Sequence, residues 1–346
     1  MTIEQLLKTA IDKQASDIHL IAGLLPYLRI DGRLQPIEGS SALAPAKTKE
    51  LVESMLDSVQ KKRFDEEKGL DFSYEIKDGS RFRVNIHYER GNIGLVARII
   101  PAEVPNMEDL SMPPIVYKMI DEPQGLILLT GPTGSGKSTS MAAMVDHINH
   151  NKALHIVTLE DPIEYLHQSD KSIIIQRELG EDMYNFNQAL RQVLRQDPNV
   201  ILVGEMRDLE TIGTTLTLAE TGHLVLATLH THDAAQTIDR IVDVFPPHQQ
   251  NQIRLQLSFS LKGVISQHLI ESINGSRIAA REVMVNTPAI ANIIRENKIA
   301  QLKTVIQTSA DSGMFTIEQD LKRLVEEGVI TKETAEIYTK FIKFED

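Results

Sequence analysis

Hydrophobic and polar positions follow two different patterns along this chain. Up to residue 100, short stretches with alternating apolar residues stand between turn signals, and they predict strands at 18–21, 27–30, 70–76, 81–88 and 93–100. Helical periodicity marks the N-terminal residues and the stretch 48–67. The pattern therefore predicts a small α+β domain with an antiparallel sheet over residues 1–100.

After residue 120 the chain changes to short, wholly apolar runs separated by segments with helical periodicity. Such runs are typical of parallel strands that helices cover on both faces. Strands are expected at 125–130, 154–159, 200–203 and 223–229, and helices at about 137–149, 186–196 and 208–221. A hairpin around Asn274-Gly275 and then helical patterns follow to the end. The fold class predicted for this part of the chain is α/β.

These changes of pattern divide the chain into four expected parts. The N-terminal domain covers residues 1–100, and a proline-dotted linker follows at 101–114. An α/β domain occupies residues 115–270. The remaining residues, 271–346, are expected to form a C-terminal hairpin and a helical region.

Composition excludes several classes of protein. The 346 residues include no cysteine, which rules out disulfides, thiol nucleophiles and cysteine-ligated zinc. No apolar run reaches the roughly 18 residues of a spanning helix, and the N-terminus lacks the pattern of a signal peptide, so we expect a cytoplasmic protein with no transmembrane segment. The formal net charge is −12 without a basic stripe, and no nucleic-acid partner is therefore expected.

The strongest chemical signal lies between an apolar strand and a helix. There the chain reads GPTGSGKS, which fits the G-x-x-x-x-G-K-[ST] pattern of a phosphate-binding P-loop. Its glycines let backbone N–H groups point at phosphates, Lys137 adds positive charge, and the Ser138 hydroxyl is suited to Mg²⁺. The residues expected to bind ATP are Gly131, Pro132, Thr133, Gly134, Ser135, Gly136, Lys137, Ser138 and Thr139.

Two acidic residues follow apolar strands downstream of this loop. Glu205 comes after VILVG, and Glu160 comes after LHIVTL, so both are expected at the sheet edge where ligands bind. A single acid at a strand end is more often a solvated loop residue, but two such acids downstream of a P-loop favour catalysis. We expect Glu205 to act on the attacking water and Glu160, with Ser138, to hold the metal geometry.

Two histidines flank the strand at 223–229. They lie seven residues apart on an extended segment, so both cannot reach one phosphate. His230 stands at the productive edge and is the candidate for contact with a γ-phosphate. His223 is expected to orient a loop or to meet a neighbouring subunit.

In this order, the segments GPTGSGKST, LEDPIEY, VILVGEMRDLET and TGHLVLATLHT resemble the Walker A, Asp box, Walker B and His box of secretion-type hexameric ATPases. The chain is most similar to the type IV pilus retraction ATPases of PilT type. The resemblance implies a RecA-like P-loop motor domain behind a PAS-like N-terminal domain, assembled as a homohexamer. It also implies hydrolysis of ATP with Mg²⁺ to power pilus retraction and twitching motility.

The resemblance further implies partners and a place in the cell. Rings of this family dock on an inner-membrane platform protein, so the protein is expected at the cytoplasmic side of the pilus base. A paralogous retraction ATPase is a possible second partner. Residues 289–298 read AIANIIRENK, where Ala291 and Asn297 replace the Arg and Gly usual in a family motif linked to retraction.

The strand at 81–88 carries a polar, basic face. Arg81, Arg83, Asn85 and His87 share it, while alternate positions are apolar. Such a face is normally solvated. The family resemblance implies instead that Arg83, together with Arg98 on the next strand, reaches a nucleotide in the same or the adjacent subunit.

Several other functions remain open from the sequence. One alternative is a PilU-like accessory retraction ATPase, and another is a pilus extension or type II secretion ATPase, although those relatives usually carry a four-cysteine zinc insertion. A small-molecule P-loop kinase would need an Arg-rich lid that the sequence does not show. A nucleic-acid translocase is disfavoured by the acidic charge balance.

Overall fold

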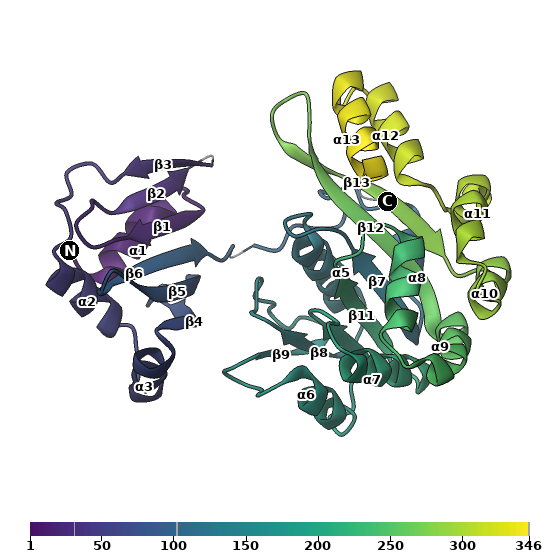
Figure 1. The fold of residues 1–346 in the computed structure, drawn as a ribbon, viewed down its shortest axis with the longest axis horizontal. Helices are drawn as coiled ribbons and strands as arrows, with labels where there is room; N and C mark the ends of the chain where they lie inside the picture. The colour runs from purple at the N-terminus through teal and green to yellow at the C-terminus, as the bar shows by residue number, and fades with distance from the viewer. Residues whose placement is uncertain (31, 102, 345–346) are drawn as a thin grey trace. The chain divides into compact units, whose positions relative to one another are not determined.

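The computed structural model describes residues 1–30, 32–101 and 103–344, which form two compact units, Met1–Glu103 and Val104–Asp346 (Figure 1). Residues 31, 102, 345 and 346, which fall in the expected N-terminal domain, linker and C-terminal region, lie outside the described residues. None of the helices in the described part of the chain is long and apolar enough to cross a bilayer.

The first unit is built on an antiparallel sheet of strand order β3-β2-β1-β6-β5-β4. Its strands are β1 (Asp17–Leu20), β2 (Tyr27–Ile30), β3 (Arg33–Pro36), β4 (Gly69–Glu75), β5 (Arg81–Glu89) and β6 (Asn92–Ile99). Phe82, Val84 and Ile86 of β5 are fully buried and pack with α1 (Ile3–Asp12) in one core. The predicted alternation along this strand is confirmed.

Two predictions for this unit were wrong in detail. The single helix expected at 48–67 is two helices, α2 (Pro45–Glu53) and α3 (Ser58–Glu67). The break arises because the Asp57 side chain accepts hydrogen bonds from Val59 N and Gln60 N, both at 2.8 Å, and so starts a new helix. Strand β3 was not predicted, since all four of its residues are exposed and carry no apolar alternation.

The second unit contains a seven-stranded sheet of order β13-β12-β7-β11-β10-β8-β9, parallel except for β13. Its strands are β7 (Gly125–Thr130), β8 (His155–Glu160), β9 (Ile173–Glu178), β10 (Val200–Val203), β11 (Leu224–Leu229), β12 (Leu261–Glu271) and β13 (Arg277–Val285). Strands β7, β10 and β11 are buried at every position. The predicted α/β class is confirmed, and so are the strands at 125–130 and 200–203.

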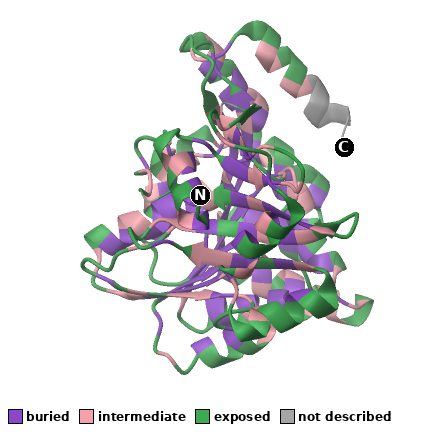
Figure 2. Ribbon diagram, turned by 90° about the vertical axis from the view of Figure 1, so that its left-hand side faces the viewer, coloured by how far each residue is buried: buried purple, intermediate pink, exposed green. Residues whose placement is uncertain are grey.

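Helices cover both faces of this sheet, and buried residues concentrate on the strands and inward helix faces (Figure 2). Alternate residues of β7 belong to two hydrophobic cores: Leu126 and Leu128 lie in one, and Ile127 and Leu129 lie in the other. The first core contains residues of α6 (Phe186–Val193), α7 (Leu209–Glu220), α8 (Ala234–Asp243) and α9 (Pro247–Ser260). The second contains residues of α4 (Pro114–Ile120) and α5 (Lys137–Asn151).

The C-terminal part differs from the sequence expectation. The hairpin β12–β13 joins the central sheet, because β12 pairs in parallel with β7, so the expected boundary at residue 271 falls inside that sheet. Strand β9 and helices α8 and α9 had not been predicted. The remaining helices are α10 (Pro288–Arg295), η1 (Ile299–Gln301), α11 (Leu302–Thr308), η2 (Ala310–Ser312), α12 (Ile317–Glu326) and α13 (Lys332–Phe344).

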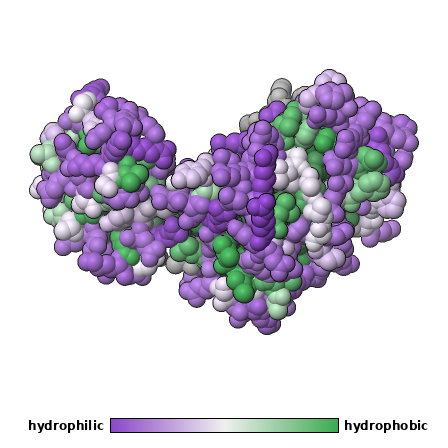
Figure 3. Space-filling view, turned by 90° about the horizontal axis from the view of Figure 1, so that it is seen from below, coloured by the Kyte–Doolittle hydropathy of each residue, from purple (hydrophilic) through white to green (hydrophobic). Residues whose placement is uncertain are grey.

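Polar and apolar side chains are unevenly distributed on the surface. Figure 3 shows a mainly hydrophilic face on which hydrophobic side chains gather in separate patches. Exposed apolar side chains include Tyr184, Phe259 and Ile173, at 91%, 65% and 64% exposure.

Candidate functional site

The loop between β7 and α5 is shaped by its glycines. Gly131, Gly134 and Gly136 have φ angles of 141°, 80° and 84°, a region that other residues rarely adopt. A Cβ atom on Gly131 would stand 2.2 Å from the carbonyl oxygen of Gln267, so only glycine fits there. The loop leads directly into α5, whose N-terminal N–H groups favour an anion.

Lys137 is folded back over this loop. The side chain is buried, and its Nζ donates hydrogen bonds to the carbonyl oxygens of Gly131 (2.7 Å) and Pro132 (3.0 Å). Burial lowers the pKa of Lys137, while the charges of Glu164 and Glu205 act in the opposite direction. A phosphate is a stronger partner for this ammonium than two carbonyl groups, because the hydrogen bond would join opposite charges.

Two further residues of the loop, Thr139 and Ser135, have hydroxyl groups that can form hydrogen bonds. The hydroxyl of Thr139 bonds that of Tyr165 at 2.9 Å, which connects α5 with the segment after β8. The buried Oγ of Ser135 has no hydrogen-bond partner. An unsatisfied buried hydroxyl at this position is a ready donor to a bound anion.

The two predicted acids lie at one edge of the sheet. Strands β8 and β10 are parallel neighbours; Glu160 is the last residue of β8, and Glu205 follows β10 by two residues. Glu160 accepts hydrogen bonds from Thr158 Oγ1 at 2.6 Å and Gln176 Nε2 at 3.1 Å. Burial raises the pKa of Glu160, so a nearby cation would favour its charged form.

Glu205 is held differently. Its backbone turn is fixed by hydrogen bonds from Gly204 N to the Leu159 carbonyl (2.8 Å) and from the Thr228 hydroxyl to the Gly204 carbonyl. Its carboxylate forms an ion pair with Arg207 Nη2 at 2.5 Å and lies 3.4 Å from His230 Nε2. The structure thus brings Glu205 and His230 together.

Arg207 was missed in the sequence analysis, although its spacing of two residues from Glu205 was a usable signal. The side chain is 70% exposed and can swing away from the carboxylate. His223 lies at the other end of β11, where its Nδ1 is 3.0 Å from the Leu218 carbonyl oxygen. Its predicted role, to orient a loop or to meet a neighbouring subunit, stays a prediction.

Arg83 and Arg98 lie directly opposite each other on β5 and β6 of the first unit. Arg83 is exposed. Arg98 donates from Nε to the buried carboxylate of Asp17 at 2.9 Å, an ion pair that the sequence did not indicate. The Arg98 side chain is 67% exposed, so this pair holds its Nε but leaves much of the guanidinium in solvent.

The residues available for a metal are oxygen donors. No cluster of three or more His, Asp or Glu side chains suited to a metal ion occurs among the described residues. Ser138 at the start of α5 and Glu160 at the sheet edge fit Mg²⁺, which binds through few protein oxygens together with phosphates and water. Both were predicted as metal ligands from the sequence.

A cavity of about 780 Å³ adjoins the end of the loop. Gly136, Thr139 and Ser140 form one wall, and the β12–β13 hairpin forms another. Its volume is within the usual range for a small-molecule site. The sequence analysis did not identify it, since the hairpin reaches the loop only through strand pairing with β7.

Comparison with known proteins places this site in context. Residues 1–277 match the family model described as type II/IV secretion system protein. The chain is 49% identical to the type IV pilus retraction ATPase PilT of Pseudomonas aeruginosa over 97% of both chains. It is 39% identical to the type IV pilus ATPase PilU of the same organism, over 97% of this chain and 88% of that one. A crystal structure of the pilus retraction motor PilT with bound ADP is similar, with a TM-score of 0.92, 46% identity and coverage of 97% and 96%.

Proposed function

This chain belongs to the type II/IV secretion system protein family, and from that premise we propose that it is a motor that hydrolyses ATP to retract type IV pili. The observation that carries the proposal is the convergence of the Lys137 loop with Glu160 and Glu205 at one sheet edge. The greater identity to the retraction ATPase than to PilU supports the motor role over the accessory one.

The proposed division of labour follows from the contacts. Residues 131–139 bind the phosphates, and Lys137 exchanges its two carbonyl partners for phosphate oxygens. Arg207 first releases the carboxylate of Glu205, which His230 orients. Glu205 then accepts the proton of the attacking water. Ser138 and Glu160 would hold Mg²⁺, which would neutralise phosphate charge.

The cavity beside Gly136 and Thr139 is the proposed place of the base and sugar. It opens from the start of α5, where the phosphates would lie, and its volume suits a nucleoside. This arrangement makes the β12–β13 hairpin part of the nucleotide site.

The proposal also covers assembly and location. The chain acts as a homohexamer in which the first unit is a PAS-like domain, and Arg83 and Arg98 act on a nucleotide in the same or the adjacent subunit. The ring docks on the inner-membrane platform protein of the pilus from the cytoplasmic side. A paralogous retraction ATPase is a further partner.

Deletion and complementation test this function. Removing the chain from its host should leave abundant pili that fail to retract, and wild-type protein should restore retraction. Lys137→Ala should lose both restoration and ATP turnover, whereas Lys322→Ala, at an exposed position on α12, should keep both. Loss of pili on deletion would instead indicate an extension motor. Retraction that persists with Lys137→Ala would indicate an accessory role without hydrolysis.

A further inference from the structure

Two buried polar side chains lie beside the phosphate loop and line the cavity proposed for the base and sugar, but they are not among the residues proposed for phosphate binding and hydrolysis. They are Gln267 on β12 and Arg281 on β13, which face each other in register and are 2% and 3% exposed. Burying an amide and a guanidinium is costly unless their hydrogen bonds are satisfied. Their partners therefore indicate what the pair does.

Gln267 bridges the loop and the first turn of α5. Its Nε2 donates to the carbonyl oxygen of Ser135 at 2.7 Å, and its Oε1 accepts from Ser140 Oγ at 2.9 Å. Its own backbone carbonyl lies against Gly131. The side chain and peptide group of Gln267 thus contact the loop at Gly131 and Ser135, and helix α5 at Ser140.

Arg281 fixes this amide and connects it to the chain that leads in from the first unit. Its Nε donates to Gln267 Oε1 at 3.0 Å, while Nη1 and Nη2 donate to the carbonyl oxygens of Ser111 (3.2 Å) and Leu110 (2.9 Å). Burial lowers the pKa of Arg281 to about 10, so the guanidinium remains protonated at neutral pH. A protonated Nε can only donate, which holds Oε1 of Gln267 toward it and Nε2 toward the loop.

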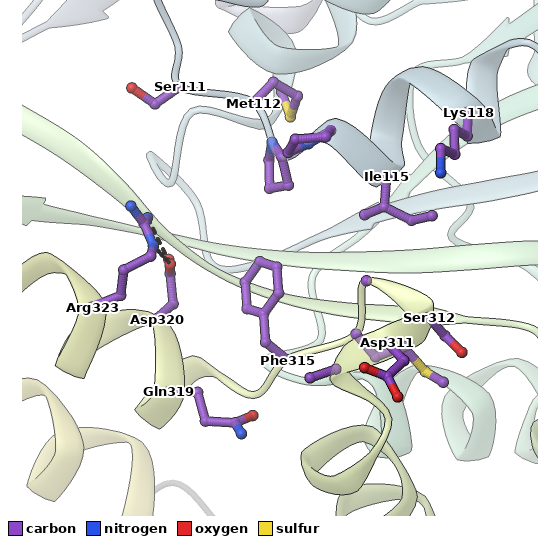
Figure 4. A pocket seen from close by; sticks show the side chains of 15 residues that line it. Ser111, Met112, Ile115, Lys118, Asp311, Ser312, Phe315, Gln319, Asp320 and Arg323 are labelled. Atoms are coloured by element: carbon purple, nitrogen blue, oxygen red, sulfur yellow. Dashed lines mark hydrogen bonds and ion pairs between the residues drawn. The ribbon is translucent and has the colours of Figure 1, made fainter.

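The backbone of Arg281 is anchored as well. Its N–H donates to Asp320 Oδ2 at 2.8 Å, and Asp320 is paired with Arg323 at 2.7 Å. Figure 4 shows this ion pair at a cavity that Ser111, Met112 and Ile115 also line. The guanidinium of Arg281 therefore joins Leu110 and Ser111 to the phosphate loop by way of Gln267, and helix α12 holds the backbone of the same residue.

We propose that Arg281 is a positioning residue of the nucleotide site. Through Gln267 it holds the phosphate loop in its binding conformation, and through the carbonyl groups of Leu110 and Ser111 it makes the segment entering from the first unit respond to occupancy of the loop. The proposal deepens the proposed function and rests on it. It assigns a role to the hairpin that the sequence motifs do not cover.

Two variants and two probes test it on the full-length protein. Arg281→Met removes the donors, and Gln267→Glu keeps the bond from Arg281 but places an oxygen against the Ser135 carbonyl. Each variant should bind both Mg–ADP and Mg–pyrophosphate about tenfold more weakly than the wild type. Arg281→Met loses a charge-assisted hydrogen bond to Gln267, and Gln267→Glu replaces the bond to the Ser135 carbonyl with a contact between two oxygens. Pyrophosphate lacks the nucleoside, so a matching loss for both probes locates the effect at the loop.

Hydrogen exchange adds a second measurement: ADP should slow exchange at residues 107–112 in the wild type and not in Arg281→Met. Lys322→Met, an exposed change on α12, is the control and should match the wild type in every assay. Gln267→Glu keeps the test available if Arg281→Met does not fold.

The outcomes separate cleanly. If the wild type binds both probes and both variants bind them with unchanged affinity, the inference about Arg281 is overturned and the proposed function is not affected. Weaker ADP binding with unchanged pyrophosphate binding also overturns it, because Arg281 would then act on the nucleoside. A wild type that binds neither probe overturns the proposed function and this inference with it.

Discussion

Three glutamates of the second unit lie in different surroundings. Glu160 is fixed by two neutral donors and its pKa is raised by burial, whereas Glu205 lies between a cationic guanidinium and an imidazole. Glu282 is buried on β13 and accepts one hydrogen bond, from Ala234 N at 3.0 Å, at the start of α8. The same functional group thus lies in three different environments.

The roles proposed for Glu205 and Glu160 should be separable by mutation. Glu205→Gln removes the proton acceptor but keeps size, so ATP turnover should fall about 10²–10⁴-fold while ATP affinity is retained. Glu160→Gln should lower turnover and also shift its dependence on Mg²⁺ concentration. Steady-state turnover and equilibrium ATP binding across a Mg²⁺ series measure both effects. Near wild-type turnover in Glu205→Gln would refute its role, and stalling with full affinity only in Glu160→Gln would exchange the two roles.

Glu282 should make stability depend on pH. Burial raises its pKa to about 7 from an ordinary value of 4.5, so between these two values the folded protein holds more protons than the unfolded one. The contribution of Glu282 to the free energy of unfolding is therefore largest below pH 4.5 and decreases as pH rises toward 7. Above pH 7 it is constant, about 3 kcal/mol lower than below pH 4.5. Denaturant unfolding of Glu282→Gln should lack this component. Parallel pH curves for the variant and the wild type would contradict the assignment.

At the scale of single elements, the glycines of the loop determine how α5 begins. Gly136 is the N-cap of α5 in a left-handed conformation, and an added Cβ would stand 3.0 Å from Gln267 Nε2. Gly134 has nearly the same φ, yet a Cβ there meets nothing within 4 Å. The two positions share a backbone requirement and differ only in space.

This pair makes a matched experiment. Gly134→Ala should destabilise the nucleotide-free protein by about 1–2 kcal/mol, the usual cost of a left-handed alanine. Gly136→Ala should cost more, because its Cβ also displaces the Gln267 amide from the Ser135 carbonyl. Thermal unfolding without nucleotide measures both. Equal losses of stability in the two variants would mean that the Gln267 amide moves aside at no cost in free energy.

At the scale of the whole molecule, the hydrophobic cores are separate. One core takes all its buried residues from Ile3 to Ala97, and the others use residues from Met107 onward. Each unit has its own complete sheet. Neither unit therefore needs the other to bury the apolar residues of its own cores.

A fragment of residues 1–103 should fold by itself. It retains the whole first core, so we expect a cooperative unfolding transition of about 5 kcal/mol or more, measured by circular dichroism in denaturant. A fragment of residues 1–80 is the control, because it lacks β5 and β6 and should not fold. Absence of a transition in the 1–103 fragment would show that the second unit is required.

The sequence by itself determined the local features of this protein. Wholly apolar runs predicted buried parallel strands such as 125–130, and the glycine and lysine spacing predicted the phosphate loop, because both signals depend on neighbours along the chain. The alternation at 81–88 likewise indicated which face of β5 is buried. Glu205 and Glu160 were found by their position after such strands.

Only the tertiary structure decided which distant residues meet. The pairing of β12 with β7 places Gln267 against Gly131, and the contacts of Arg281 with Leu110 and Ser111 span about 170 positions. Exposed strands such as β3 and buried polar pairs carry no periodic signal, since their residue types are common elsewhere in the chain. Strand order and register are set by packing of the whole sheet, and for that reason the surroundings of the loop could not be predicted from its motif.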